Sequence, residues 1–319
     1  MATDHPGDGR ANASQLPDDI AAAIQAIRDD REHGASWLAR AAAQALLKAG
    51  ERYRDAPDET WNAMIRATAQ ALVSARPSMA AIANAAARVW YAGQSAAPSS
   101  REALLAEEKR LATQSDQARQ ALLSNAAKLL RGTVYTLSRS GTLESVLREL
   151  GRGHIIERVI VAESRPGGEG VALGRSLAQA GLSVMLVADA AAGVFIGGAT
   201  CVALGADSLR ADGSLVNKVG SYPLALVAKM ANKSVYVVCE TLKIAAPDFP
   251  LELEEMDPAD LLRDVDDVSE RLSALNPYFD VTPASLIAAY ITEAGILDRE
   301  AIARHAETAG AALARLRAE

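Results

Sequence analysis

Hydroxyl and charged side chains follow the first apolar run in the second half of the chain, residues 133–137. The residues in this segment are Ser138, Arg139, Ser140, Gly141 and Thr142. Hydroxyl groups, a guanidinium and a glycine directly before a helix can bind a phosphate, because the N–H groups of the first helical turn are free donors. The same residue types are also common helix caps, so this segment alone leaves a purely structural role open.

Charged residues also follow the next three apolar runs. Glu163 and Arg165 come after the second run, Asp189 after the third and Asp207 after the fourth. An unpaired charge beside an apolar strand is costly, so we expect these side chains to pair with one another or with a ligand. A structural network of ion pairs is the alternative.

Asn217 and Lys218 precede a further predicted helix that begins near Ser221. A lysine beside a helix start can reach a phosphate or a carboxylate in the same cleft. The alternative for Lys218 is an ordinary surface lysine.

Cysteines and histidines contribute no expected chemistry. Cys201 and Cys239 lie inside apolar runs without a basic neighbour, which is typical of buried thiols in a reducing compartment. The four histidines do not have the spacing of a metal site. We therefore expect no metal centre and no cofactor.

The elements that must position these residues divide the chain in two. Residues 16–131 carry apolar side chains at the three-and-four spacing of helices, with prolines at predicted helix starts. From residue 132, short and nearly continuous apolar runs alternate with helical segments, which indicates parallel strands covered on both faces. Such a sheet binds its ligand at the carboxyl ends of the strands, where the charged residues are.

We predict an α/β protein with an N-terminal all-helical domain, residues 16–131, followed by a Rossmann-like parallel sheet with helices on both faces, residues 132–319. The Asp- and Gly-containing segment 1–15 is expected to be a disordered tail. The segment 258–319 is expected to return to helix, interrupted by a loop around residues 276–280.

Composition and charge restrict the possible classes of function. The chain has 319 residues, a net charge of −7 and no apolar run long enough to span a bilayer. Its 33 basic residues are spread along the sequence, so we expect no direct binding to nucleic acid. The prediction is a soluble, cytoplasmic protein that does not contact a membrane.

Several segments together resemble a known superfamily. It contains the alpha, beta and delta regulatory subunits of eukaryotic translation initiation factor two-B, methylthioribose-1-phosphate isomerase and ribose-1,5-bisphosphate isomerase. The matching stretches are Arg76-Pro77-Ser78-Met79-Ala80 with Asn84, residues 136–140, 163–166 and 205–207, Asn217-Lys218-Val219-Gly220-Ser221-Tyr222 and residues 276–283. Their order and spacing run from the helical half nearly to the C-terminus.

The resemblance implies a helical domain, a Rossmann-like domain and a homodimer formed through the C-terminal domain. It also implies a phosphorylated sugar or a nucleoside monophosphate as ligand. The isomerases of this superfamily convert a phosphorylated aldose into a ketose phosphate with a catalytic cysteine and an aspartate. Asp207 matches that aspartate, whereas Ser138 stands at the position of the cysteine and Glu169 at that of a common glutamine.

Two main hypotheses about function follow. The first is an initiation-factor-two-B-like protein that binds a phosphorylated ligand for sensing or assembly, because a serine hydroxyl without a base moves a proton poorly. The alternative is an aldose–ketose isomerase acting on a pentose 1-phosphate, with Asp207 and Ser138 as catalytic residues. A third is a scaffold with a vestigial pocket. The expected ligand-binding residues are Arg76, Arg139, Ser140, Gly141, Thr142, Glu163, Arg165, Asp189, Asn217 and Lys218.

Overall fold

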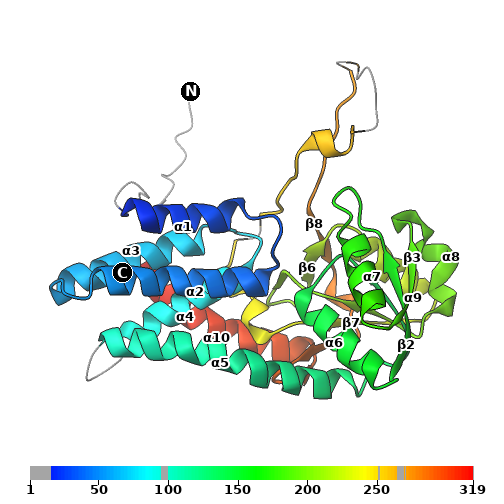
Figure 1. The fold of residues 1–319 in the computed structure, drawn as a ribbon, viewed down its shortest axis with the longest axis horizontal. Helices are drawn as coiled ribbons and strands as arrows, with labels where there is room; N and C mark the ends of the chain where they lie inside the picture. The colour runs from blue at the N-terminus through cyan, green and yellow to red at the C-terminus, as the bar shows by residue number, and fades with distance from the viewer. Residues whose placement is uncertain (1–15, 95–99, 251, 264–268, 270, 319) are drawn as a thin grey trace.

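The computed structural model describes residues 16–94, 100–250, 252–263, 269 and 271–318. The expected tail, residues 1–15, lies outside the described residues. A bundle of helices lies beside a sheet that carries its own helices, as Figure 1 shows. No described helix is both long and apolar enough to cross a membrane.

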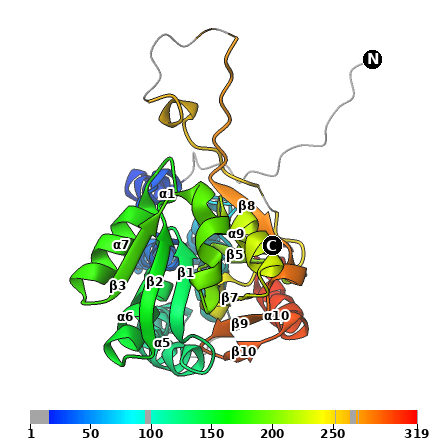
Figure 2. The same cartoon turned by 90° about the vertical axis from the view of Figure 1, so that its right-hand side faces the viewer.

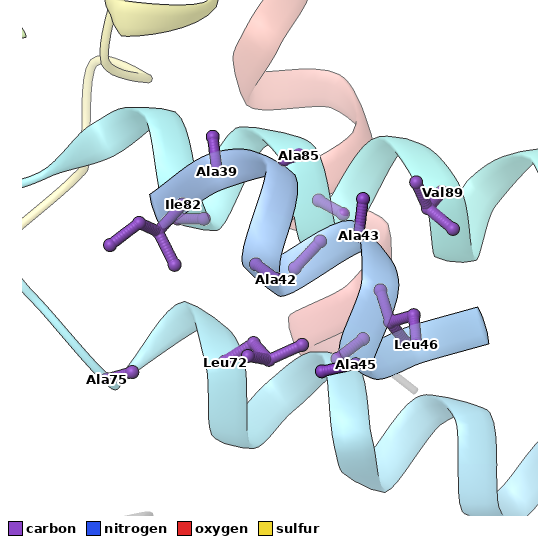
Figure 3. Close-up of a cluster of buried hydrophobic side chains, with 14 of the residues drawn as sticks. Ala39, Ala42, Ala43, Ala45, Leu46, Leu72, Ala75, Ile82, Ala85 and Val89 are labelled. Carbon is purple, nitrogen blue, oxygen red and sulfur yellow. The ribbon is translucent and has the colours of Figure 1, made fainter. Parts of the chain in front are cut away.

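Helices make up the first part of the described chain. They are α1 (Asp18–Asp29), α2 (Ala35–Arg52), α3 (Asp58–Val73), α4 (Ala80–Gln94) and α5 (Ser100–Ala126). Prolines precede α1 and α3, where their fixed φ suits a helix start. Alanines let the helices approach closely, and in Figure 3 Ala45 of α2 faces Leu72 of α3.

A mostly parallel sheet of seven strands follows, in the order β10-β9-β7-β4-β1-β2-β3. Only the pair of β9 and β10 is antiparallel. The strands are β1 (Gly132–Leu137), β2 (Ile156–Ala162), β3 (Ser183–Val187), β4 (Cys201–Leu204), β7 (Ser234–Val238), β9 (Ala289–Thr292) and β10 (Gly295–Leu297). The predicted α/β fold class is therefore confirmed.

Helices cover both faces of this sheet, as predicted. They are α6 (Gly141–Arg152), α7 (Glu169–Gln179), α8 (Ala192–Phe195), α9 (Ser221–Met230) and α10 (Arg299–Ala318). Val134 of β1 packs in a cluster with residues of α5, α6 and α7, whereas the adjacent Tyr135 packs in the cluster that contains α9 and α10 residues. Figure 2 shows α6 and α7 beside β2 and β3.

The prediction of helix for residues 258–319 is wrong over most of its described part. Only α10 is a long helix, and the rest contains β8 (Phe279–Thr282), β9 and β10. Strand β8 joins β5 (Ser208–Leu209) and β6 (Leu215–Lys218) in a small antiparallel sheet. Strands β8, β9 and β10 have three or four residues each, too few for a periodic pattern to reveal them.

The last part of α10 returns to the helical bundle. Leu313 and Leu316 are fully or almost fully buried in the same apolar cluster as residues of α2, α3 and α4. Residues 258–263 and 271–275, by contrast, extend away from the rest of the chain in both views (Figures 1 and 2). At the base of this extension, Glu254 and Tyr278 contact Arg76 and Lys218.

Candidate functional site

The ends of β1, β2 and β4 meet in one place, as the sequence predicted for a parallel sheet. The backbone N–H of Ser138 donates to Ser164 Oγ at 2.6 Å, and both residues have a left-handed backbone, with φ of 57° and 63°. A Cβ added at Gly205 would lie 2.5 Å from the Cβ of Ser140. Only glycine at position 205 therefore allows the segment after β1 to approach the end of β4 so closely.

Two of the side-chain hydroxyls that follow β1, those of Ser140 and Thr142, already have partners. Ser140 Oγ accepts a hydrogen bond from the N–H of Leu143 at 3.4 Å and so caps α6. Thr142 Oγ1 donates to Glu240 Oε1 at 2.8 Å. Asp189, after β3, accepts the backbone N–H groups of Ser164 and Arg165, both at 2.7 Å. These contacts give the residues structural roles, and their binding of a ligand stays a prediction.

Two predicted cations lie at the rim of the cleft. The side chain of Arg139 is half exposed and pairs with Glu144 at 3.0 Å. Arg165 is more exposed and pairs with Glu163 at 3.1 Å. The alternative of a structural ion pair, weighed from the sequence for Glu163 and Arg165, describes the second contact.

Lys218, on β6, is almost fully buried. Its Nζ lies 2.8 Å from Glu169 Oε1 and 3.9 Å from the centre of the Tyr278 ring. The other carboxylate oxygen of Glu169, Oε2, is buried and has no hydrogen-bond partner. Asn217, the residue before Lys218, donates a hydrogen bond from its side-chain amide to Ser221 Oγ at 2.8 Å, at the start of α9.

Arg76 comes from the loop before α4 and is buried at the junction of the helices and the sheet. Its Nε and Nη2 donate to the two carboxylate oxygens of Glu254, both at 2.7 Å. Its Nη1 donates to the carbonyl of Asp30 at 2.5 Å, and Ser78 Oγ also contacts Glu254. Arg76 therefore joins three segments that are distant in sequence.

Asp207 differs from these residues because its carboxylate has no hydrogen bond or ion pair in the described part of the chain. The residue keeps some solvent-accessible surface, although neighbouring atoms crowd around it. This desolvation raises the pKa of Asp207 to about 6, although the positive charges of Lys243, Arg76 and Lys218 oppose the shift. A reachable, unpaired carboxyl with such a pKa is a typical proton-transfer group.

Several residues of the site were not predicted from the sequence. Lys243 Nζ donates to the carbonyl of Ala206 at 2.7 Å and lies 3.9 Å from Glu240. Glu240 lies two residues after the end of β7, so applying the strand-end rule to this fifth run would have found it. The ring of Tyr278 lies on Lys218, and burial, with the nearby carboxylates of Glu169 and Asp207, raises the pKa of its hydroxyl. No local pattern marks Tyr278.

The cations around the cleft are therefore matched by carboxylates. The pairs are Arg76 with Glu254, Arg139 with Glu144, Arg165 with Glu163, Lys218 with Glu169 and Lys243 with Glu240. Asp207 is the acid left without a direct partner among the described residues. Within the same residues, no group of three or more His, Cys, Asp or Glu could hold a metal ion.

Comparison with known proteins places this arrangement in a family. Residues 31–299 match the model of the Initiation factor 2 subunit family. Ribose 1,5-bisphosphate isomerase of Archaeoglobus fulgidus is 31% identical over 289 residues, which cover 89% of this chain and 91% of that protein. Methylthioribose-1-phosphate isomerase of Methylococcus capsulatus is 31% identical over 301 residues, 89% of this chain and 85% of that protein.

A solved structure with the same fold is the translation initiation factor eIF-2B of Pyrococcus horikoshii OT3. It covers 88% of this chain and 98% of its own, with a TM-score of 0.74 and 29% identity. The family match spans the chain from α2 to β10 and includes the site residues described above. The chain belongs to the Initiation factor 2 subunit family.

Proposed function

We propose that this protein binds a pentose phosphate in the cleft and interconverts its aldose and ketose forms, with Asp207 as the acid/base group. The observation that carries the proposal is the free carboxyl of Asp207, which is desolvated but reachable from solvent. A pKa near neutrality suits proton transfer, because the group is then mostly ionised at pH 7 and still a stronger base than an ordinary aspartate. Relatives with the names of two pentose-phosphate isomerases support the same reaction class.

The reaction moves a proton between neighbouring carbons of the sugar. In this proposal the Asp207 carboxylate takes the proton from C2, the electron pair forms a double bond between C1 and C2, and the bond between C1 and the ring oxygen breaks. Negative charge develops on that ring oxygen, where the ammonium groups of Lys218 and Lys243 stabilise it and one of them protonates it. The C2 hydroxyl then returns a proton to the lysine as the carbonyl forms at C2, and the protonated Asp207 gives its proton to C1, which yields the ketose.

Ser138 is proposed to position the sugar and not to exchange a proton. Its hydroxyl can donate a hydrogen bond to a sugar oxygen, whereas its ordinary pKa is far too high for a proton acceptor at neutral pH. The start of α6, directly after Ser140, supplies free N–H groups for the phosphate. Arg139 and Arg165 are exposed and now pair with Glu144 and Glu163. Each guanidinium can leave its glutamate and bind a phosphate oxygen of the ligand.

A second candidate is a homologue that binds the same ligands without turnover. Two observations favour it: a serine stands where the resemblance places a thiol, and Arg76 and Lys218 are already paired with carboxylates. Such a protein would act by sensing or assembly. We also propose a cytoplasmic homodimer through the C-terminal domain, which light scattering of the purified chain would test.

The deciding experiment is an isomerase assay with ribose-1,5-bisphosphate and methylthioribose-1-phosphate, on the native protein and on Asp207→Asn. We expect turnover by the native protein and a loss of about a thousandfold in kcat/KM in the variant, since general acid–base catalysis contributes about 10² to 10⁴. Asp248→Asn is the matched control, because Asp248 is exposed and pairs only with Arg317.

The pH profile gives an independent check. As the base must be ionised, kcat/KM is expected to rise with pH through about 6, the raised pKa of Asp207, and then to level off. Binding of both sugars without any turnover would support the second candidate. Full activity in Asp207→Asn would exclude the proposed mechanism.

A further inference from the structure

A cavity of about 440 Å³ lies between the helical bundle and the end of β7. Its walls come from α2, α4 and α5, and its base from the residues after β7 and the turn between β9 and β10. The charged residues around it are Arg40, Arg88, Glu240, Lys243 and Glu293. Its size is within the usual range for small-molecule sites.

The helices leave this space open because their facing residues are alanines. Ala39 and Ala43 come from α2, Ala81 and Ala85 from α4, and Ala118 and Ala121 from α5. Spacings of three and four residues place each pair on one helix face. In Figure 3, Ala39 and Ala43 lie on the side of α2 away from Ala45 and Leu72. The cavity therefore has an apolar wall built from small side chains.

The base of the cavity carries two acidic side chains, Glu240 and Glu293. Glu293 accepts the backbone N–H of Thr241 at 3.0 Å and also contacts its hydroxyl. Glu240 accepts the hydroxyls of Ser36 and Thr142 at 2.9 and 2.8 Å. The nearest ammonium, Lys243, lies 3.9 Å from Glu240 and donates to the carbonyl of Ala206. Glu293 therefore has only neutral donors among the described contacts of the site.

A cation lies on the helical side of the same cavity. Arg40 has no hydrogen bond or ion pair in the part of the chain that the structure describes. Arg88, one helix away, differs because it pairs with Glu107 at 2.7 Å. The cavity thus presents an uncommitted guanidinium, an apolar wall and two carboxylates.

We propose that this cavity is a second binding site, for a small amphoteric molecule of the amino-acid class. The ammonium group of the ligand would lie at Glu293 and Glu240, its carboxylate at Arg40 and its apolar part along the alanines. Each charge of such a ligand meets an opposite charge of the protein, and the alanines offer an apolar surface to the rest of the ligand. A ligand with only one of the two charges would leave one end of the site unmatched.

The site adjoins the residues around Asp207 and shares Glu240 and Lys243 with them. Glu240 contacts both sides, because its Oε1 binds Thr142 of the segment after β1 and its Oε2 binds Ser36 of the cavity. Lys243 binds the carbonyl of the residue before Asp207. Arg40, Glu293 and the alanines have no part in the proposed isomerase reaction, so this proposal does not depend on it.

Alanine-methyl NMR of the full chain tests the proposal, since six alanines line the cavity. The probes are L-leucine and 6-aminohexanoate, which carry both charges at two separations, with hexylamine and hexanoate as single-charge references. We expect at least one amphoteric probe to shift the cavity methyls and to bind about tenfold more tightly than both references, as one charge-assisted contact contributes about 1.5 kcal/mol or more.

Two neutral variants complete the experiment. Arg40→Gln and Glu293→Gln should each weaken the amphoteric probe about tenfold, whereas the exposed controls Arg175→Gln and Glu307→Gln should leave its affinity unchanged. Arg40 is exposed, so its replacement keeps the fold. The absence of shifts with both amphoteric probes, or equal binding of the amphoteric probe to native protein and Arg40→Gln, would overturn the proposal.

Discussion

At the scale of single residues, the main feature of the cleft is which of its charged side chains are paired. Arg76 and Lys218 are buried and bonded to Glu254 and Glu169, while Asp207 keeps its carboxyl free of direct partners among the described residues. A phosphate that enters must therefore compete with a carboxylate for each buried cation. This competition makes Glu169 a determinant of affinity.

Glu169→Gln is expected to tighten the binding of ribose 5-phosphate about tenfold. The amide keeps the size of the side chain but removes the charge that pairs with Lys218 at 2.8 Å, so the ammonium becomes available for the phosphate. Isothermal titration calorimetry would measure the change. Glu307→Gln, on the exposed face of α10, is the matched control, and equal affinity of native protein and Glu169→Gln would show that Lys218 does not contact the phosphate.

At the scale of secondary-structure elements, α9 depends on a residue from another strand. Gly220 has a φ of 104° and no side chain, so α9 lacks a cap of its own. Asp280 of β8 supplies it, because its carboxylate accepts the N–H of Gly220 at 2.7 Å and that of Tyr222 at 3.1 Å. The same strand pairs with β6, which carries Asn217 and Lys218.

Asp280→Ala should lower the free energy of unfolding by about 1 to 2 kcal/mol, the usual cost of losing a helix cap. Asp280→Asn keeps one acceptor oxygen and should lose less. Urea denaturation followed by circular dichroism measures both variants beside Asp248→Ala, whose carboxylate is exposed. A full-sized loss in the Asp248 control, or none in Asp280→Ala, would contradict this role of the cap.

At the scale of the whole molecule, polar contacts fasten the helical bundle to the sheet. Asn84 of α4 donates to the carbonyls of Leu242 and Ile244 at 2.7 and 2.8 Å. The hydroxyl of Ser208, on β5, accepts from the N–H of Ala80 at 2.7 Å. The pair of Arg76 and Glu254 adds a buried ionic contact, so a residue expected to bind ligand also joins the two parts.

Arg76→Met is expected to destabilise the protein by about 3 kcal/mol, because it leaves the largely buried carboxylate of Glu254 without its cation. The double variant Arg76→Met/Glu254→Leu should recover most of this loss, since no buried charge then remains unpaired. Thermal denaturation distinguishes the cases. Arg317→Met, which breaks an exposed pair, should change little, and a double variant no more stable than the single one would contradict the argument.

The sequence by itself determined the fold class and the edge of the sheet at which the predicted strand-end residues lie. Apolar runs alternating with helices predicted the sheet, and the residues after those runs, including Ser138 and Asp207, do meet at the carboxyl ends of β1 and β4. This worked because strand burial and the parallel topology follow from local patterns along the chain. The short strands β8, β9 and β10 escaped, since three or four residues carry too little pattern.

Only the tertiary structure decided which charges are free and which are paired. Glu254 lies 178 positions from Arg76, and Glu240 lies 204 from Ser36, so no local spacing could link them. Their contacts depend on how the helical bundle packs against the sheet. That packing left Asp207 without a direct partner among the described residues and opened the alanine-lined cavity beside it, and both carry the proposals about function.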